Sequence, residues 1–369
     1  MKIGVPREIK SQEKRVALTP AGVAELVRRG HTVLVENEAG VGSSIADSDF
    51  IASGAIISES AERVWEESDM IVKVKEPIDV EYPLMREGQI LFTYLHLAAD
   101  EPLTRVLLKN KVTGIAYETV QGNDGSLPLL TPMSEVAGRL SLQAGCRCLE
   151  STSRGRGILL AGVPGVKPAE VAIIGGGVSG INAAHMAVGM GARVTILDIN
   201  AERLSYLEDI FHSRIVTLMS NALNVQRCLA ESDLVIGAVL IPGAKAPKLI
   251  SGKDLSIMKK GAALVDIAID QGGCAETSRP TTHVDPIYIE NNVVHYCVAN
   301  MPGAVPITST YALTNVTLPY AITIADMGAD DALRSVPALL KGLNAYNGQL
   351  TNEQVARAHG MEYAGRKIA

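Results

Sequence analysis

The chain has 369 residues, of which 47% are hydrophobic and 4% are aromatic, and its formal net charge is −6. This length is sufficient for two domains, and their cores should be aliphatic rather than aromatic. A mildly acidic chain without a block of lysine and arginine lacks the basic surface typical of nucleic-acid-binding proteins, so we expect no nucleic-acid partner.

The cysteines indicate neither a disulfide framework nor a zinc site. Their number is odd, and no two of them form a C-x-x-C pair: Cys146, Cys148, Cys228, Cys274 and Cys297. The chain begins with MKIGVPREIK, which lacks the apolar core of a signal peptide. We therefore expect a protein of the reducing cytoplasm, without a metal.

The first 129 residues alternate short apolar strands with helices. Thr19 followed by Pro20 is typical of a helix start, and Gly30 is typical of its end. The predicted strands cover residues 2–5, 32–36, 70–74, 89–94 and 112–117, and the predicted helices cover residues 19–30, 60–67 and 101–109. This alternation predicts a doubly wound α/β domain.

Residues 170–198 predict a dinucleotide-binding βαβ unit. An apolar strand over residues 171–174 leads into Gly175-x-Gly177-x-x-Gly180, and a helical stretch continues to about residue 190. A second strand over residues 193–197 ends at Asp198. The glycines let a pyrophosphate approach the backbone at a helix N-terminus, and the acid can accept a hydrogen bond from a ribose 2′-hydroxyl. The alternative is a tight strand-to-helix turn without a ligand.

Further strands predict that this unit continues to about residue 306. They cover residues 214–218, 234–240, 262–267 and 293–298. Residues 291–325 contain no Asp, Glu, Lys or Arg, but they contain three prolines, whereas a membrane span needs about 20 mostly apolar residues. We predict a strand, a loop and a buried helix from Pro306 to about Asp326, then a helical tail over residues 330–369.

The nucleotide unit lies in the middle of the chain, between helices that start near Thr131 and Pro306. We therefore predict a discontinuous substrate domain of residues 1–129 and 307–369 and an inserted nucleotide domain of residues 130–306. A cleft between two such domains would let a hinge closure exclude water from the reaction.

Four polar residues outside the glycine motif could carry chemistry: Arg15, Lys75, His96 and Asp270. All but Arg15 follow the carboxyl end of an apolar strand, where open α/β sheets bind ligands. The two cations could hold a substrate carboxylate, and the histidine and the aspartate could transfer protons. The alternatives are a solvated arginine, a surface Lys75–Glu76 pair, a structural histidine and a turn-forming aspartate.

The chain resembles the alanine dehydrogenase / transhydrogenase alpha-subunit family, and in particular the NAD-dependent bacterial enzymes that interconvert L-alanine and pyruvate. The matching motifs lie at residues 3–9, 13–20, 39–43, 71–77, 93–97, 174–180, 266–273 and 295–306. The resemblance implies two Rossmann-like domains with the NAD domain inserted. It also implies a homohexamer with small-molecule substrates (L-alanine, pyruvate, ammonium) and no membrane partner.

The resemblance also assigns roles to individual residues. Arg15 and Lys75 correspond to the residues that hold the substrate carboxylate, and His96 and Asp270 correspond to the catalytic pair. The implied cofactor contacts are Ser134, Gly175, Gly177, Val178, Gly180, Asp198, Arg203, Ser220, Val239, Leu240, Ile267, Asp270, Asn300 and Met301. Arg203 could tolerate a 2′-phosphate, but Asp198 should repel it, so NAD is the expected cofactor. The wall of the alanine pocket could include Tyr94, Met133 and Met301.

Three other functions compete with this one. The NAD-binding component of a proton-translocating transhydrogenase shares the motif, but such a module would not need Lys75, His96 and Asp270. A dehydrogenase of the saccharopine or opine type would act on a larger amino acid. A non-catalytic NAD sensor would bind NADH without turnover.

Overall fold

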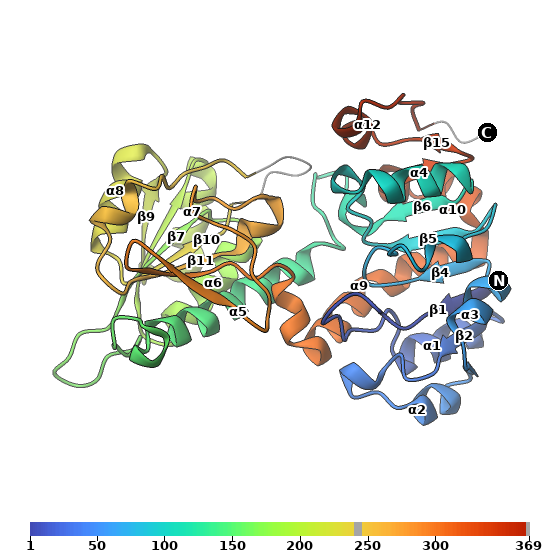
Figure 1. Ribbon diagram of the computed structural model, residues 1–369, viewed down its shortest axis with the longest axis horizontal. Coiled ribbons are helices and arrows are strands. Elements are labelled where there is room, and N and C mark those ends of the chain that lie inside the picture. Colours follow the sequence, from blue (N-terminus) through green and yellow to red (C-terminus); the bar gives the residue numbers. More distant parts are fainter. Residues whose placement is uncertain (240–245, 367–369) are drawn as a thin grey trace. The chain divides into compact units, whose positions relative to one another are not determined.

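The computed structural model describes residues 1–239 and 246–366, and the chain divides into two compact units (Figure 1). Unit 1 comprises Met1–Met133 and Val305–Ala369, and unit 2 comprises Ser134–Ala304. Both units contain a mostly parallel sheet with helices, so the predicted α/β class is confirmed. Leu240, an expected cofactor contact, lies outside the described residues.

Unit 1 contains an eight-stranded sheet in the order β15-β14-β6-β5-β4-β1-β2-β3. Its strands are β1 (Lys2–Val5), β2 (Thr32–Glu36), β3 (Ile56–Ser58), β4 (Met70–Val72), β5 (Ile90–Thr93), β6 (Thr113–Ala116), β14 (Leu343–Tyr346) and β15 (Gln349–Leu350). Strands β1 to β6 are parallel, and their order reverses between β1 and β4. Such a switch point binds ligands at the carboxyl ends of its strands.

The helices of unit 1 begin with the caps that their sequences provide. Thr19 Oγ1 accepts a hydrogen bond from the backbone N–H of Gly22, as the Thr-Pro pattern predicts, and Asp100 caps the helix that begins at Glu101. The helices are α1 (Pro20–Arg28), α2 (Asp47–Ala52), α3 (Ala61–Glu67), α4 (Glu101–Lys109), α9 (Pro306–Met327), α10 (Ala329–Ser335), α11 (Pro337–Gly342) and α12 (Glu353–His359).

The tail is not entirely helical, so that prediction is wrong. Strands β14 and β15 form an antiparallel hairpin, and β14 also pairs antiparallel with β6. The hairpin turn is Asn347-Gly348, and both residues have positive φ (48° and 77°). An Asn-Gly turn of this kind is a strong hairpin signal, which the prediction of a helix overlooked.

Unit 2 contains a seven-stranded sheet in the order β12-β13-β11-β10-β7-β8-β9. Its strands are β7 (Glu170–Ile174), β8 (Arg193–Asp198), β9 (Ile215–Met219), β10 (Leu234–Gly237), β11 (Ala263–Asp266), β12 (Ile287–Glu290) and β13 (Val293–Tyr296). Only β12 is antiparallel, and the parallel order reverses between β7 and β10. This is the same doubly wound arrangement as in unit 1.

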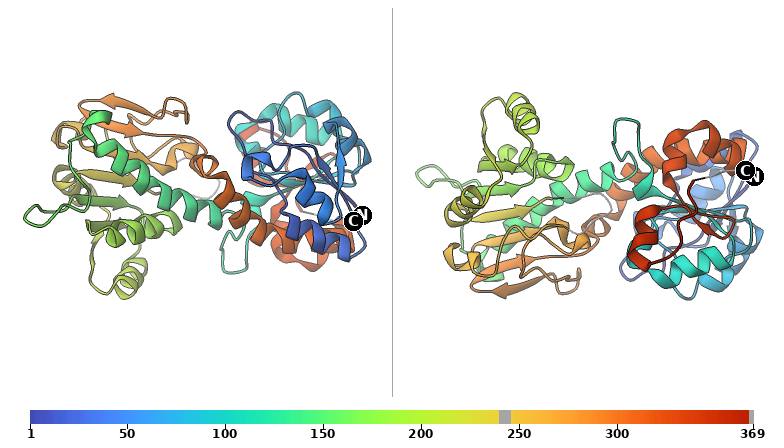
Figure 2. Two further views of the ribbon diagram at one scale, coloured as in Figure 1. Left: turned by 90° about the horizontal axis from the view of Figure 1, so that it is seen from below. Right: turned by 90° about the horizontal axis from the view of Figure 1, so that it is seen from above.

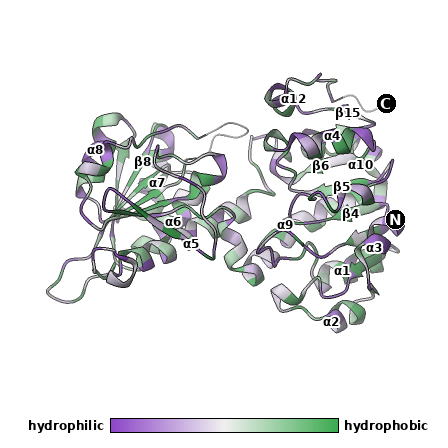
Figure 3. Cartoon of the chain, viewed as in Figure 1, coloured by the Kyte–Doolittle hydropathy of each residue, from purple (hydrophilic) through white to green (hydrophobic). Residues whose placement is uncertain are grey.

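Helices cover both faces of the unit 2 sheet, as the two views of Figure 2 show. They are α5 (Thr131–Leu149), which begins in the last residues of unit 1, α6 (Val178–Gly189), α7 (Ala201–Phe211) and α8 (Ala222–Glu231). Along β7, Val171 and Ile173 belong to one buried cluster, and Ala172 and Ile174 belong to another. The strands are accordingly hydrophobic on both faces (Figure 3).

Several strands end earlier than the sequence predicts. Strand β4 ends at Val72 rather than at residue 74, β10 ends at Gly237, and β11 ends at Asp266. After β11 the chain turns into the 3-10 helix Ile267–Gln271, because the Asp266 carboxylate accepts a hydrogen bond from the Ala268 N–H. Lys75 therefore lies in the loop beyond β4, and Asp270 lies on the 3-10 helix beyond β11.

Candidate active site

Arg15 lies in the loop between β1 and α1, and it is buried rather than solvated. It is 2% exposed. Its Nε and Nη2 donate to the two carboxylate oxygens of Glu13 at 2.7 and 2.6 Å, and its Nη1 contacts Met133 Sδ at 3.0 Å. Burial alone would lower the pKa of Arg15, but the Glu13 hydrogen bonds and the charges of Glu13, Tyr94 and Glu8 together outweigh it and raise the pKa. The structure thus contains a permanent, buried cation.

A buried ion cluster determines the backbone just before Lys75. The Lys73 Nζ is fully buried and forms ion pairs with Glu8 at 3.3 Å and Glu81 at 2.9 Å. The other Glu8 oxygen accepts hydrogen bonds from the N–H groups of Val74 (2.6 Å) and Lys75 (3.4 Å). This cluster ends β4 and positions the half-buried Lys75 beyond the strand.

His96 follows β5 in a left-handed backbone conformation, with φ 49°. The Glu118 carboxylate accepts hydrogen bonds from the N–H groups of Leu95 and His96, the latter at 2.6 Å. The imidazole stacks on Tyr94, with ring centroids 5.8 Å apart, and its Nδ1 lies 3.0 Å from a Glu76 oxygen. His96 is therefore an exposed side chain whose backbone and ring are both held in place.

The Tyr94 ring links these groups within unit 1. Its hydroxyl donates to the Leu129 carbonyl at 2.6 Å. Burial raises the pKa of Tyr94, and the nearby Arg15 charge acts in the opposite direction. Within unit 1, Tyr94 therefore lies near both the Arg15 charge and the His96 ring, and the Lys75 charge acts on Glu76, which contacts that ring.

The glycine motif of unit 2 forms a backbone cradle at the start of α6. Gly175 has φ +106°, and a Cβ at Gly180 would lie 1.9 Å from the Gly175 carbonyl oxygen, so both positions require glycine. A Cβ at Gly177, by contrast, would meet no atom within 4 Å. Gly177 is the N-cap of α6 and has no side chain to cap the helix. Open space before uncapped N–H groups fits a pyrophosphate.

Asp198 ends β8 beside this cradle. Its two oxygens accept hydrogen bonds from the N–H groups of Gly176 (2.7 Å) and Asn200 (2.9 Å). Arg203, in the first turn of α7, donates from Nε to the Gly176 carbonyl. The acid and the cation both lie against the glycine loop, in the arrangement that a dinucleotide ribose requires.

Asp270 is exposed on the 3-10 helix after β11, in a loop that two side chains hold. The buried Asp266 carboxylate accepts from the Ala268 and Cys274 N–H groups and from the Ser278 hydroxyl. On the other side, the Lys248 ammonium donates to the carbonyls of Gly272, Gly273 and Ala275.

The remaining expected cofactor contacts in the described part of unit 2 differ in burial. Val239 lies beside the cradle, since a Cβ at Gly175 would be 3.1 Å from its nitrogen. Ser134 accepts a hydrogen bond from Ser179 on α6 through its carbonyl, and the Ser220 N–H donates to the Asp198 carbonyl. Asn300 has φ 62°. The half-buried contacts are Ser134, Ser220, Val239, Ile267 and Asn300, whereas Met301 is buried in the core.

Sequence reasoning missed the carboxylates that surround the three residues in unit 1. Glu13, Glu76 and Glu118 each contact one of the candidate residues or its loop, and all three are buried or half-buried. One signal was available, because Lys73 interrupts an otherwise apolar strand and a buried lysine needs carboxylate partners. Glu13 lies two residues from Arg15, whereas Glu76 and Glu118 reach His96 from other loops that no local pattern identifies.

Other kinds of site are not found in the described part of the chain. No group of three or more His, Cys, Asp or Glu residues there could hold a metal ion. No helix among the described residues is long and apolar enough to cross a membrane. All five cysteines are free thiols.

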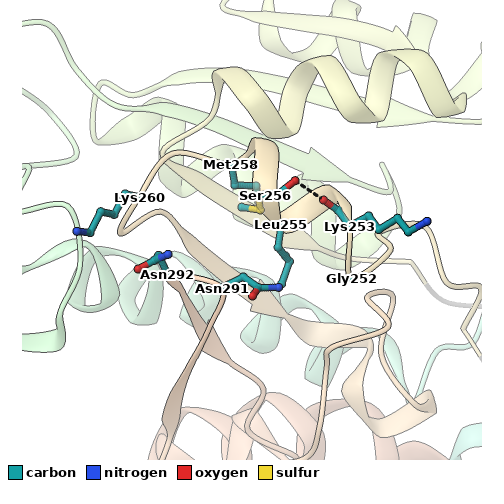
Figure 4. A pocket seen from close by; sticks show the side chains of 8 residues that line it. All are labelled: Gly252, Lys253, Leu255, Ser256, Met258, Lys260, Asn291 and Asn292. Atoms are coloured by element: carbon teal, nitrogen blue, oxygen red, sulfur yellow. Dashed lines mark hydrogen bonds between the residues drawn. The ribbon is translucent and has the colours of Figure 1, made fainter.

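A pocket of about 720 Å³ in unit 2 lies at the amino ends of the strands, whereas the cradle lies at their carboxyl ends (Figure 4). Lys260 and Asn292 line it just before the amino ends of β11 and β13, and the Ser256 hydroxyl donates to the Lys253 carbonyl beside them. Ligands of open α/β sheets bind at the carboxyl ends, so this pocket is not the candidate active site.

Comparison with known proteins identifies relatives over nearly the whole chain. The family model "Alanine dehydrogenase/PNT, N-terminal domain" matches residues 4–137, and "Alanine dehydrogenase/PNT, C-terminal domain" matches residues 141–353. Alanine dehydrogenase of Methanococcus maripaludis is 58% identical over 98% of each chain. Alanine dehydrogenase of Mycolicibacterium smegmatis is 56% identical over 97% of this chain and 96% of that protein.

Solved structures agree with these relatives. An L-alanine dehydrogenase structure superposes with a TM-score of 0.94 at 53% identity and covers 98% of this chain and 99% of that one. A transhydrogenase from Sinorhizobium meliloti shares the fold, with a TM-score of 0.81 at 20% identity over 96% and 99% of the two chains. The chain therefore belongs to the alanine dehydrogenase/PNT family.

Proposed function

We propose that this protein catalyses the NAD-dependent oxidative deamination of L-alanine to pyruvate and ammonia, together with the reverse reductive amination. The observation that carries the proposal is the placement of Arg15, Lys75 and His96 at the switch point of unit 1 in a member of this family. A carboxylate clamp beside a proton-transferring group is what an amino acid substrate requires.

NAD binds to unit 2 in this proposal. The residues there fit it, because the Gly177 position leaves space before the N-terminus of α6 and Asp198 lies beside the glycine loop. The exposed Val178, the half-buried Ser220 and Val239, and the carboxylate of Asp198 would line the dinucleotide. Asp198 favours NAD over NADP, because its charge repels a 2′-phosphate.

The chain's own groups divide the reaction as follows. Arg15 and Lys75 hold the alanine carboxylate, and the amine is bound in its neutral form. NAD, when bound, accepts the hydride that leaves the alanine Cα, which becomes the carbon of an iminium ion. His96 or Asp270 takes a proton from water as the water attacks that carbon. The same pair returns that proton to the nitrogen and removes the proton of the new hydroxyl group as the C–N bond breaks, which leaves pyruvate, ammonia and one proton on the pair.

The domain roles follow from these assignments. We propose that residues 1–129 and 307–369 form the substrate domain and that residues 130–306 form the NAD domain. Of the expected pocket-wall residues, Tyr94 and Met133 belong to unit 1, and Met133 contacts Arg15. Met301 belongs to the core of unit 2. His96 and Asp270, the proposed catalytic pair, belong to different units.

The proposal extends to assembly and location. A homohexamer in the cytoplasm is proposed, without a nucleic-acid or membrane partner. Exposed apolar side chains on the loop before β7, which projects from unit 2 in Figure 1, support self-association: Leu159, Val163 and Val166 are 63%, 53% and 61% exposed. Light scattering on the purified protein tests the hexamer, and cell fractionation tests the location.

The decisive experiment is NADH formation, followed by absorbance, with NAD and L-alanine beside glycine, L-serine, L-glutamate and L-lysine. Rapid turnover with L-alanine that is lost in Lys75→Ala supports both the activity and the clamp. Measurable NADH binding without turnover of any of these amino acids would contradict the proposal and favour a transhydrogenase-like module or a sensor.

A further inference from the structure

Glu76 is a buried carboxylate that the mechanism above does not use. It is 8% exposed, and its two oxygens have different partners. One oxygen forms an ion pair with Lys10, from the loop after β1. The other lies 3.0 Å from His96 Nδ1. Glu76 therefore joins two loops of unit 1 at the ring of the proposed catalytic histidine.

The other contacts of His96 determine where its ring lies. Glu118 holds the backbone N–H groups of Leu95 and His96, and the Tyr94 ring stacks on the imidazole. Among the described residues, only Nδ1 of the ring has a hydrogen-bond partner, and Nε2 has none. Nε2 is therefore the ring nitrogen available to a substrate.

An ionised carboxylate can only accept a hydrogen bond, so the proton between Glu76 and His96 belongs to Nδ1. In the neutral imidazole, Nε2 then carries the lone pair and can act as a base. The same arrangement stabilises the imidazolium that forms when Nε2 takes a proton. Burial raises the pKa of Glu76, but the His96 hydrogen bond, the charges of His96 and Lys75 and the Lys10 hydrogen bond together outweigh burial and lower the pKa below its ordinary value.

We propose that Glu76 is a positioning residue of the reaction: it fixes the Nδ1–H tautomer of His96 and supplies the negative charge that stabilises its protonated form, while Lys10 moderates that charge. This inference rests on the proposed function for its kinetic effect, but not for the tautomer. The charged and titratable groups around the ring are Glu76, Lys75, Lys10, Glu118 and Tyr94.

Two substitutions test the charge. Glu76→Gln keeps the size of the side chain and removes its charge, so kcat should fall about 10- to 100-fold while the NADH dissociation constant stays unchanged. The histidine-dependent limb of the kcat/KM pH profile should move to lower pH. Lys10→Gln is the matched control at the other end of the carboxylate: kcat should stay within about twofold, and the limb should move to higher pH.

A double-mutant cycle separates positioning from a structural role. In a His96→Asn background, Glu76→Gln should reduce kcat by less than about twofold, because its effect requires the imidazole. Equal losses in both backgrounds would overturn the proposal, as would a kcat within twofold of the wild type in Glu76→Gln alone. A limb that moves in the same direction in both single variants would overturn it as well.

The tautomer has a readout that does not depend on activity. Nitrogen-15 NMR of the ring, assigned by comparison with His96→Asn, should show Nδ1–H for neutral His96 in the full chain. Glu76→Leu removes the acceptor, and Nε2–H should then predominate. An unchanged Nδ1–H signal would overturn the proposal. If the wild type does not turn over L-alanine, the proposed function fails, but this measurement still decides the role of Glu76.

Discussion

The two units share the order of their six parallel strands but use the carboxyl ends of those strands in different ways. In unit 1 the edge carries paired charged side chains: Arg15 pairs with Glu13 in its own loop, whereas Lys73 and Glu76 pair with partners from the loop after β1. In unit 2 the edge consists mainly of backbone, with glycines and the N–H groups at the start of α6. One carboxylate at this edge, that of Asp198, accepts a hydrogen bond from the Gly176 N–H. One edge provides charge for chemistry, and the other provides shape for a nucleotide.

The difference shows what each edge tolerates. Buried charges depend on every partner, because removing one leaves another without compensation in a medium of low polarity. A backbone cradle depends on the absence of side chains, so a single methyl group can fill it. Substitutions should therefore separate catalysis, stability and nucleotide affinity into distinct effects.

The largest expected effect comes from removing the proton-transfer group of unit 1. His96→Asn should lower kcat about 100- to 10,000-fold, because that is the usual cost of losing a positioned acid–base group. Asparagine tolerates the left-handed backbone at this position, so strain should not contribute. Stopped-flow kinetics and NADH titration measure the two quantities. A near-normal kcat would exclude His96 from the mechanism. A weakened NADH affinity would contradict the division of catalysis and nucleotide binding between the two units.

The next effect concerns stability. Lys73→Met leaves Glu8 and Glu81 buried without their cation and should lower the free energy of unfolding of unit 1 by about 3–5 kcal/mol. The matched control is Arg105→Met, which removes an exposed partner of Glu101 and should cost less than about 1 kcal/mol. Urea denaturation measures both. An equal loss in the free energy of unfolding in the two variants would show that the buried cluster does not stabilise the end of the strand.

A methyl group added to the glycine cradle of unit 2 should weaken nucleotide binding and leave stability nearly unchanged. Gly177→Ala adds a Cβ in open space, so the free energy of unfolding should change by less than about 1 kcal/mol. The Cβ enters the proposed pyrophosphate site, so NADH affinity should fall about 10- to 100-fold, the cost of a lost hydrogen bond to a charged group. Gly189→Ala is the control, since it lies in the same helix with equally open space; it should leave affinity unchanged. Equal affinities of both variants would place the pyrophosphate elsewhere.

The smallest effect is a pH dependence of stability. The pKa of Glu76 is lower in the folded protein than the ordinary value of about 4.3. The ion pairs of Glu76 therefore stabilise the folded protein at pH values above that ordinary pKa. This contribution is lost as the pH falls toward the pKa of the folded protein. The difference in melting temperature between wild type and Glu76→Gln should shrink from pH 7 to pH 3. A difference that grows in that range would show that Glu76 is protonated in the folded protein.

Local patterns predicted most of the strands and helices because the signals were local. The Thr19-Pro20 start of α1 and the glycine turn before α6 depend on neighbouring residues, and both were found. The Asn347-Gly348 hairpin was also local, but its strands are too short to show alternation. The predicted end of β4 was wrong because charged side chains from other loops end this strand at Val72.

The candidate site divides in the same way. The glycines and Asp198 form one contiguous motif, which the sequence predicts together. Arg15 and its partner Glu13 lie two residues apart, but Glu76 and Glu118 reach His96 only through the sheet topology. Partners across loops depend on the fold as a whole, so a single sequence does not specify them.

The β14–β15 hairpin has a consequence for synthesis on the ribosome. Strand β14 completes the sheet beside β6, yet residues 116 and 343 are made roughly 10 to 45 s apart at ordinary translation rates of about 5–20 residues per second. During that interval the nascent N-terminal segment carries an uncovered strand edge, while all of unit 2 emerges and can fold. A stop codon before residue 343 should therefore leave a chain with one finished unit and one prone to aggregate.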